Sequence, residues 1–341
     1  MPTTGPPVRQ HALRLVAFGV LGALVLIELA VRIATGTVFA LHGKDSDSYV
    51  TIDPLVGRIP KPGIRVRHPN GFNINIGDHG TRSNGDDRPR AERPLTLVVG
   101  DSFAFGDGVN DEESWPAVLE RLTGRRVINA AVPGFGLDQA VLRAEQLAAV
   151  YAPDVIVAGF IPHDILRCEL SYWSGHAKPY FDVDAGGLSL HPAAPPSGSV
   201  LAPLKRLLSV SITLDRFFPK FLYWEGPEQM AAHQRGREVA CRLMQRLVTL
   251  GETRHAQIVV VAQPQQPTAT AEQRELKDGL LTCAAAAHVL AVDLFPPLDR
   301  LSPEQRAQLF ERHMTAAGNR FVATELAGFL ERHPAPHDDA Q

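Results

Sequence analysis

The stretch LTLVVGDSF, residues 95–103, decides how the rest of the sequence is interpreted. Residues 95–99 are apolar or β-branched and predict a short buried strand. Gly100, Asp101 and Ser102 follow at once and are typical of a tight turn. In open parallel sheets, functional groups collect at the carboxyl ends of strands, so this turn is the first candidate for chemistry.

Strands and helices alternate from this point to the end of the chain. The alternation predicts parallel βα units with helices on both faces of the sheet. The expected fold is therefore α/β, a three-layer α/β/α sandwich around a mainly parallel five-stranded sheet of flavodoxin-like type. The further strands are expected at 126–129, 155–161, 257–262 and 289–295, and the helices at 114–122, 138–150, 228–253, 271–287 and 315–332.

The N-terminal segment predicts a transmembrane signal anchor over residues 15–33. Residues 15–27 carry no charge, and about 20 helical residues are needed to span the hydrocarbon core. Arg9 and Arg14 precede the span, which places residues 1–14 in the cytoplasm and the rest of the chain in the periplasm or outside the cell. Two alternatives stay open, a cleaved secretory signal and a buried amphipathic helix.

Between the anchor and the first strand, residues 34–92 are rich in Gly, Asp, Pro and Arg, which predicts a stalk and a small cap region. Residues 72–76 alternate like an edge strand. The main domain is expected over 93–333, with a disordered tail at 334–341.

Composition excludes some classes of function. A net charge of -3 with interleaved basic and acidic residues gives no electrostatic case for nucleic-acid binding. The three cysteines stand far apart, so a zinc ribbon or a redox pair is not expected. One disulfide is possible, but the spacing does not identify it.

Three further motifs lie where the sheet predicts chemistry. Gly134 follows the second strand, His163 and Asp164 follow the third, and His313 precedes the last helix with Glu311 two residues earlier. Alone, the Gly134 motif is more often an ordinary turn and His313 more often a surface histidine, while a capped turn at Asp164 is as frequent as a functional site. Because they occur in order at one edge of the sheet, a nucleophile, oxyanion donors and a base could converge there. Arg82 and Arg167 are expected to be surface or ion-pair residues.

This ordered set resembles the SGNH/GDSL hydrolase superfamily over residues 93–333. Residues 100–102 match its nucleophile block and Gly134 its glycine block. In the third block His163 stands where an Asn is usual. In the last block Glu311 replaces an Asp that usually lies two or three residues before the His. The segments DPLVG, KPG and KPYF (53–57, 61–63 and 178–181) look like those of membrane-anchored bacterial members.

The resemblance implies a serine esterase or deacylase that needs no cofactor and no metal. It implies that Ser102 is the nucleophile, that His313 is the general base and that Glu311 orients the base. The expected substrate is an acylated carbohydrate, such as an O-acylated envelope polysaccharide, or another ester. A polysaccharide O-acyltransferase with the same residues and an inactive SGNH-like binding domain are the alternatives.

The resemblance also implies an oxyanion hole formed by the backbone N–H groups of Ser102 and Gly134 and by the ring of His163. Asp101 and Asp164 would support it. An imidazole donates one hydrogen bond when neutral, so the substitution of His for Asn is expected to make the hole sensitive to pH.

Overall fold

The computed structural model describes residues 7–34, 49–67, 71–85, 94–173, 176–184, 187–193, 211, 213–214 and 234–335. Its contacts divide the chain into two units. One unit comprises Met1–Tyr49 and Pro196–Gly226, and the other comprises Val50–Pro195 and Pro227–Gln341.

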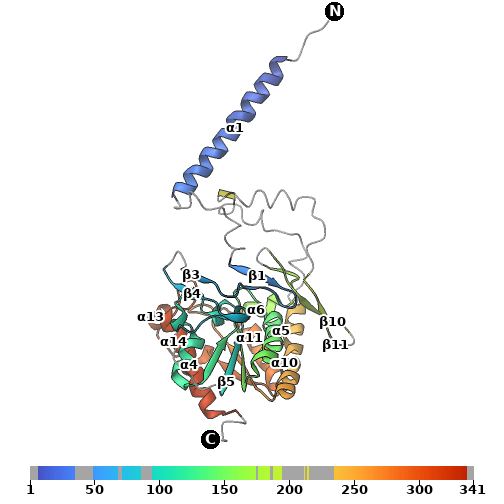
Figure 1. Ribbon diagram of the computed structural model, residues 1–341, viewed down its shortest axis with the longest axis vertical. Coiled ribbons are helices and arrows are strands. Elements are labelled where there is room, and N and C mark those ends of the chain that lie inside the picture. The colour runs from blue at the N-terminus through green and yellow to red at the C-terminus, as the bar shows by residue number, and fades with distance from the viewer. Residues whose placement is uncertain are drawn as a thin grey trace, which may run out of the picture. The chain divides into compact units, whose positions relative to one another are not determined.

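The second unit contains the sheet to which β5 (Leu95–Val99) belongs (Figure 1). This sheet has five strands, and every neighbouring pair is parallel. This confirms the predicted fold class. The order β13-β12-β7-β5-β6 is the flavodoxin-like order, which reverses its winding between β5 and β7 and opens a crevice at their carboxyl ends. The strands are β5 (Leu95–Val99), β6 (Arg126–Asn129), β7 (Val155–Phe160), β12 (Gln257–Ala262) and β13 (Leu290–Asp293).

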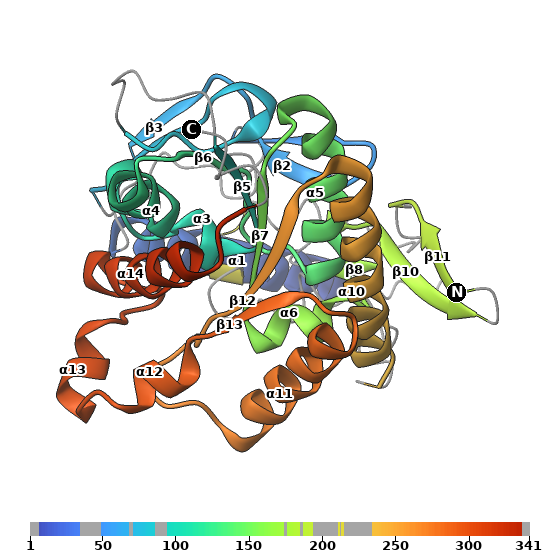
Figure 2. The ribbon, with the colours of Figure 1, turned by 90° about the horizontal axis from the view of Figure 1, so that it is seen from below.

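Helices cover both faces of this sheet (Figure 2). On one face, α5 (Leu137–Tyr151), α10 (Gln234–Arg254) and α11 (Ala271–Ala286) pack over a core that includes Leu97 and Val99. On the other face, α4 (Trp115–Thr123) and α14 (Ala316–Arg332) pack over a core that includes Val98. Successive side chains of β5 enter different cores, which is why the strand shows no alternation of buried and exposed residues.

Most helix ends lie within two residues of their predicted positions. Thr315, the predicted cap of α14, accepts a hydrogen bond from the Gly318 amide at 3.2 Å. The prediction for 228–253 extends to residues 228–233, which lie outside the described residues. The remaining elements of the sheet unit are α3 (Ser102–Phe105), α6 (Pro162–Arg167), α12 (Phe295–Asp299), α13 (Pro303–Gln308), η1 (Asp78–Gly80), η2 (Asp111–Glu113), β8 (Tyr172–Trp173), β9 (His176–Ala177), β10 (Tyr180–Asp184) and β11 (Gly187–His191).

Two short antiparallel hairpins precede the sheet, β1 (Val50–Asp53) with β2 (Gly57–Pro60) and β3 (Arg65–Arg67) with β4 (Asn73–Asn75). The Arg82 amide that follows them donates to the carbonyl of Asn129, the last residue of β6, at 2.8 Å. The described hairpin residues therefore belong to the sheet unit. The predicted stalk falls on 35–48 and most of the predicted tail on 336–341, both outside the described residues.

The other unit contains α1 (Pro7–Ala34), of which Ala12–Ala34 is long and apolar enough to cross a membrane. None of this apolar window is buried, which favours a membrane anchor or a signal sequence over the buried amphipathic helix. Arg32 pairs with Glu28 one turn earlier at 2.7 Å. The Glu28 carboxylate also accepts from the Ser211 hydroxyl at 2.7 Å and from the Thr213 amide at 3.1 Å.

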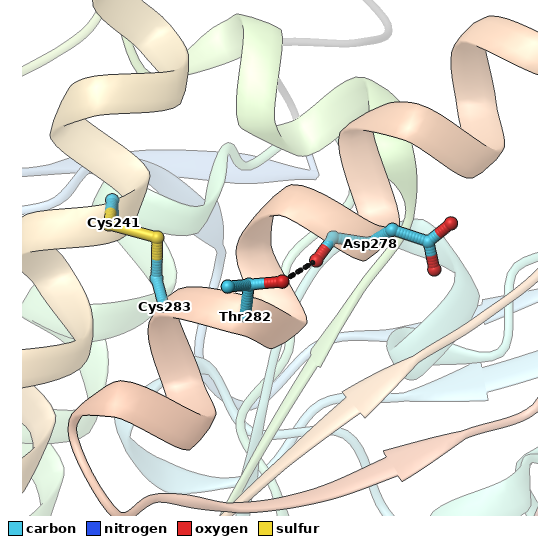
Figure 3. The surroundings of a disulfide bond; sticks show 4 residues. All are labelled: Cys241, Asp278, Thr282 and Cys283. Atoms are coloured by element: carbon cyan, nitrogen blue, oxygen red, sulfur yellow. Dashed lines mark hydrogen bonds between the residues drawn. A yellow bond between two sulfur atoms is a disulfide. The ribbon is translucent and has the colours of Figure 1, made fainter.

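A disulfide between Cys241 and Cys283 joins α10 to α11 (Figure 3). The third cysteine, Cys168, is free and buried. The two bridged residues are 42 positions apart in the sequence but face each other because the two helices pack side by side.

Candidate active site

Ser102 begins a short helix directly after β5. Gly100 allows this turn: a Cβ there would lie 2.5 Å from the carbonyl oxygen of Gly159 on the neighbouring strand, so a larger residue would not fit. Asp101 caps the helix α3 by accepting from the Phe103 amide at 2.9 Å. The sequence therefore holds Ser102 at the carboxyl edge of the sheet, beside the point where the winding reverses.

His313 contacts Ser102. Its Nε2 atom lies 3.0 Å from the Ser102 Oγ atom, although the two residues are 211 positions apart. The ring also packs against Phe103, with ring centroids 5.1 Å apart. The contact fits the geometry in which an imidazole accepts a proton from a serine hydroxyl.

The structure does not bring the Glu311 carboxylate to His313. The Glu311 amide donates to the His313 carbonyl at 2.8 Å, which closes a tight turn and leaves the Glu311 side chain exposed. The carboxylate that faces His313 is Asp107, whose Oδ2 atom lies 3.8 Å from Nδ1. The predicted orienting acid is corrected accordingly.

Asp107 reaches this position because α3 lasts only one turn. The amides of Gly106 and Asp107 both bond to the Ser102 carbonyl, at 3.1 and 2.9 Å, so the chain folds back next to the serine. Gly106 has a φ of 84°, which favours glycine. Sequence reasoning missed Asp107, and a glycine four residues after Ser102 that ends the helix was the signal that could have found it.

Gly134 lies in the turn after β6 with a φ of 87°. The Val132 amide in the same turn donates to the Gly100 carbonyl at 3.0 Å, which ties this turn to the one that carries Ser102. A Cβ on Gly134 would stand 3.8 Å from the Trp173 indole. Trp173 was not singled out from the sequence and forms one wall beside the glycine.

His163 lies in the first turn of α6, directly after β7. Its Nδ1 atom is 3.2 Å from Nη2 of Arg167, and the edge of its ring meets Trp173 with centroids 5.3 Å apart. Burial, and then the positive charge of Arg167, lower the pKa of His163 to about 4. The ring is therefore neutral above about pH 5, and the expected effect of its protonation on the oxyanion hole lies below that pH.

Arg167 is buried rather than a surface residue. Its Nη1 atom donates to Asp164 Oδ1 at 2.7 Å and to the Phe135 carbonyl at 2.9 Å, and lies 3.8 Å from Asp101 Oδ2. The guanidinium stacks over Trp173 at 4.9 Å. One side chain thus connects the loops after β5, β6 and β7, which carry Ser102, Gly134 and His163.

The two supporting aspartates are buried beside this guanidinium. Burial raises the pKa of Asp101, and the charge of Arg167 opposes that rise. Burial, together with the charge of Asp101, raises the pKa of Asp164 well above its usual value. Asp164 also accepts from the Ile161 amide at 3.0 Å and so braces the start of α6.

Lys178 holds the other end of α6. Its ammonium group donates to the carbonyls of Arg167 and Leu170, at 3.1 and 2.9 Å, and pairs with the buried carboxylate of Asp138 at 2.5 Å. The helix that carries His163 and Arg167 is therefore braced by buried polar contacts at both ends.

Arg82 is also buried and contacts the segment after β5, beyond Ser102. It pairs with Asp111 at 2.9 Å and donates to the carbonyls of Phe105 and Val109, at 2.9 and 2.6 Å. These contacts surround the turn that carries Asp107. Among the residues that the structure describes, no group of three or more His, Cys, Asp or Glu side chains is arranged to hold a metal ion.

No family model matches the chain, and no curated protein matches it. Solved structures similar to it include a lipase/acylhydrolase from Enterococcus faecalis (12% identity, 70% of this chain, 96% of the other, TM-score 0.42). Others are a catalytic mutant of an acetylxylan esterase from Geobacillus stearothermophilus (16%, 71%, 94%, 0.39) and a psychrotrophic esterase from Pseudoalteromonas sp. (10%, 70%, 98%, 0.41). Likenesses at this level assign neither family nor activity to the chain.

Proposed function

We propose that this chain is a serine hydrolase of the SGNH/GDSL type that cleaves an ester bond. The observation that carries the proposal is the 3.0 Å contact between Ser102 Oγ and His313 Nε2 at the carboxyl edge of the sheet. A domain that only binds a ligand has no need of this pairing, so the contact favours an enzyme over the inactive alternative.

In the proposed reaction, Ser102 Oγ attacks the ester carbonyl carbon while its proton passes to His313 Nε2. The resulting tetrahedral oxyanion collapses, the bond to the alcohol breaks, and the alcohol leaves with the proton from His313. Water then attacks the acyl-serine and gives its proton to His313. The bond between the acyl carbon and Ser102 Oγ breaks, Ser102 Oγ takes the proton from His313, and the acid is released. Asp107 stabilises the imidazolium in both half-reactions.

The oxyanion would be held by the backbone N–H groups of Ser102 and Gly134 and by Nε2–H of His163. Each is a neutral donor that can face developing negative charge without a proton transfer. The proposed substrate is an O-acylated carbohydrate or a similar ester. The half-buried ring of Trp173 beside Gly134 and His163 supports this choice, because it offers a flat apolar wall near the reacting carbonyl.

The test is turnover of p-nitrophenyl acetate by the purified full chain in detergent, compared with Ser102→Ala and His313→Ala. Each substitution is expected to lower kcat by about 10³-fold or more, because nucleophile and base act as one unit. His333→Ala is the matched control, since His333 stacks on Phe329 at the end of α14 with centroids 4.2 Å apart.

The proposal fails if the wild type is no faster than Ser102→Ala and an active-serine phosphonate does not label Ser102. Labelling without hydrolysis, together with acyl transfer to an added saccharide, would favour the acyltransferase alternative.

We further propose that α1 anchors the chain in a membrane with the sheet unit on the oxidising side. The Cys241–Cys283 disulfide supports this placement, because such bonds persist outside the reducing cytosol. In protein extracted under an alkylating block, denaturation should expose one reactive thiol, and reduction should expose two more. Cys241→Ser with Cys283→Ser is the control. Three reactive thiols before reduction would contradict the placement.

A further inference from the structure

We propose that Arg167 is a positioning residue that sets the tautomer of His163, so that Nε2 carries the proton and faces the oxyanion. The proposal rests on the ester hydrolysis proposed above. It assigns a role to a buried arginine that has no part in the Ser102–His313 pair.

The tautomer follows from the chemistry of the two partners. A guanidinium has five N–H donors and no acceptor. Its Nη2 atom lies 3.2 Å from His163 Nδ1, so that nitrogen must offer a lone pair. A neutral imidazole carries one proton, which then resides on Nε2.

The tautomer matters because an oxyanion hole needs a donor. In the other tautomer Nε2 would present a lone pair to the oxyanion and repel it. An asparagine in the same place always has N–H donors on its amide nitrogen, so it needs no partner to select its form. The dependence on Arg167 is therefore specific to a histidine in this loop.

The guanidinium of Arg167 is held in the orientation that its hydrogen bond to His163 requires. Asp164 and the Phe135 carbonyl hold Nη1, at 2.7 and 2.9 Å, and Trp173 covers the face of the group at 4.9 Å. Lys178 holds the Arg167 carbonyl at 3.1 Å. With Nη1 and the plane both held, the position of Nη2 is fixed, and one of its two N–H groups can donate to His163.

The surroundings also disfavour a second proton on the ring. Among the described residues, a cation, Arg167, contacts His163 Nδ1, and an aromatic ring, that of Trp173, meets the edge of the imidazole. The carboxylates of Asp164 and Asp101 lie on the Nη1 side of the guanidinium and are engaged by it. Burial and the charge of Arg167 thus keep the imidazole neutral.

The first test reads the ring nitrogens directly. The full chain is labelled with ¹⁵N-histidine in detergent, and the signal lost in His163→Asn identifies His163. The wild type at pH 7 should show Nδ1 as the acceptor and Nε2 as protonated. Arg167→Lys keeps the charge but loses the fork geometry, and should give a mixture of tautomers. A wild-type ring protonated on Nδ1 overturns the proposal.

The second test asks whether Arg167 acts through His163. Arg167→Lys should lower kcat about 10- to 100-fold in the wild type, since a complete donor is worth about 10²–10³. In the His163→Asn background the same change should cost about threefold or less. Equal losses in both backgrounds would overturn the proposal and mark Arg167 as a general support of the fold.

A matched control is Arg246→Lys. Arg246 also stacks on an aromatic ring, Phe181, at 5.1 Å and pairs with a carboxylate, Glu145, at 2.6 Å, but it lies on α10. Its replacement should leave kcat and the His163 signals unchanged. Because the nitrogen signals need no turnover, an inactive chain with Nε2 protonated would refute the proposed function and leave the tautomer assignment standing.

Discussion

The two sides of Ser102 are organised very differently. On the base side, His313 and Asp107 are 22% and 36% exposed, and their side chains stand 3.8 Å apart. On the oxyanion side, the contacts that Arg167 makes to Asp164, Phe135 and His163 range from 2.7 to 3.2 Å in a largely buried network. The proposed base side is partly exposed and has a long ion pair, whereas the proposed oxyanion side has short contacts that are largely buried.

The difference follows from what each side would have to do. A base must take a proton, pass it to a leaving alcohol and take another from water, which requires access. Oxyanion donors help most when they are aimed before the charge develops and do not have to reorient. Low dielectric strengthens each such contact, and the same low dielectric requires every polar group to be partnered. Short, buried contacts that hold side chains in place are therefore concentrated where the negative charge would appear.

The largest effect on kcat that tests this difference is expected from the loss of the His163 ring. His163→Ala should lower kcat about 10²–10³-fold, since one oxyanion donor is removed. His163→Asn should retain most of the activity, because the amide nitrogen donates in its place. The measurement is kcat for p-nitrophenyl acetate at pH 7.

The pH profile provides the control. With its pKa near 4, His163 stays neutral from pH 5 upward, so wild type and His163→Asn should share the same acidic limb. If the wild type alone lost activity as the pH fell from 7 to 5, His163 would be gaining a proton there. The surroundings of His163 would then be more polar than its burial indicates.

The fold was predictable because its signals are local. β5 and β7 are buried on both faces, and apart from Thr96 their residues are apolar. Helices α11 and α14 each follow a threonine whose side chain accepts a hydrogen bond from the first turn. The turn at Gly100 follows from the glycine and from the strand before it. Alternation of strands and helices then leaves few possible arrangements of the sheet.

Asp107, Trp173 and the contacts of Arg167 were not predictable in this way. Asp107 faces His313 only because α3 ends after one turn and the last turn before α14 returns to the same edge. Arg167 bonds to the loop after β6, 32 residues earlier, and no local pattern marks such a pair. The disulfide also depends on how α10 packs against α11, which cysteine spacing does not reveal.

The smallest effect is expected from Asp107→Asn. Its comparison with Glu311→Gln shows which of the two carboxylates assists His313. Partly exposed ion pairs are worth about 0.2–1 kcal/mol, so Asp107→Asn should lower kcat only about two- to fivefold. Glu311→Gln is the matched control and should change kcat less than Asp107→Asn does, because its carboxylate is exposed and only its amide contacts His313. Both are measured as kcat for p-nitrophenyl acetate at pH 7. A larger loss in Glu311→Gln would restore the acid expected from the family pattern. A loss of kcat in Asp107→Asn as large as that in His163→Ala would contradict the difference between the two sides of Ser102, because the base side would then be organised as tightly as the oxyanion side.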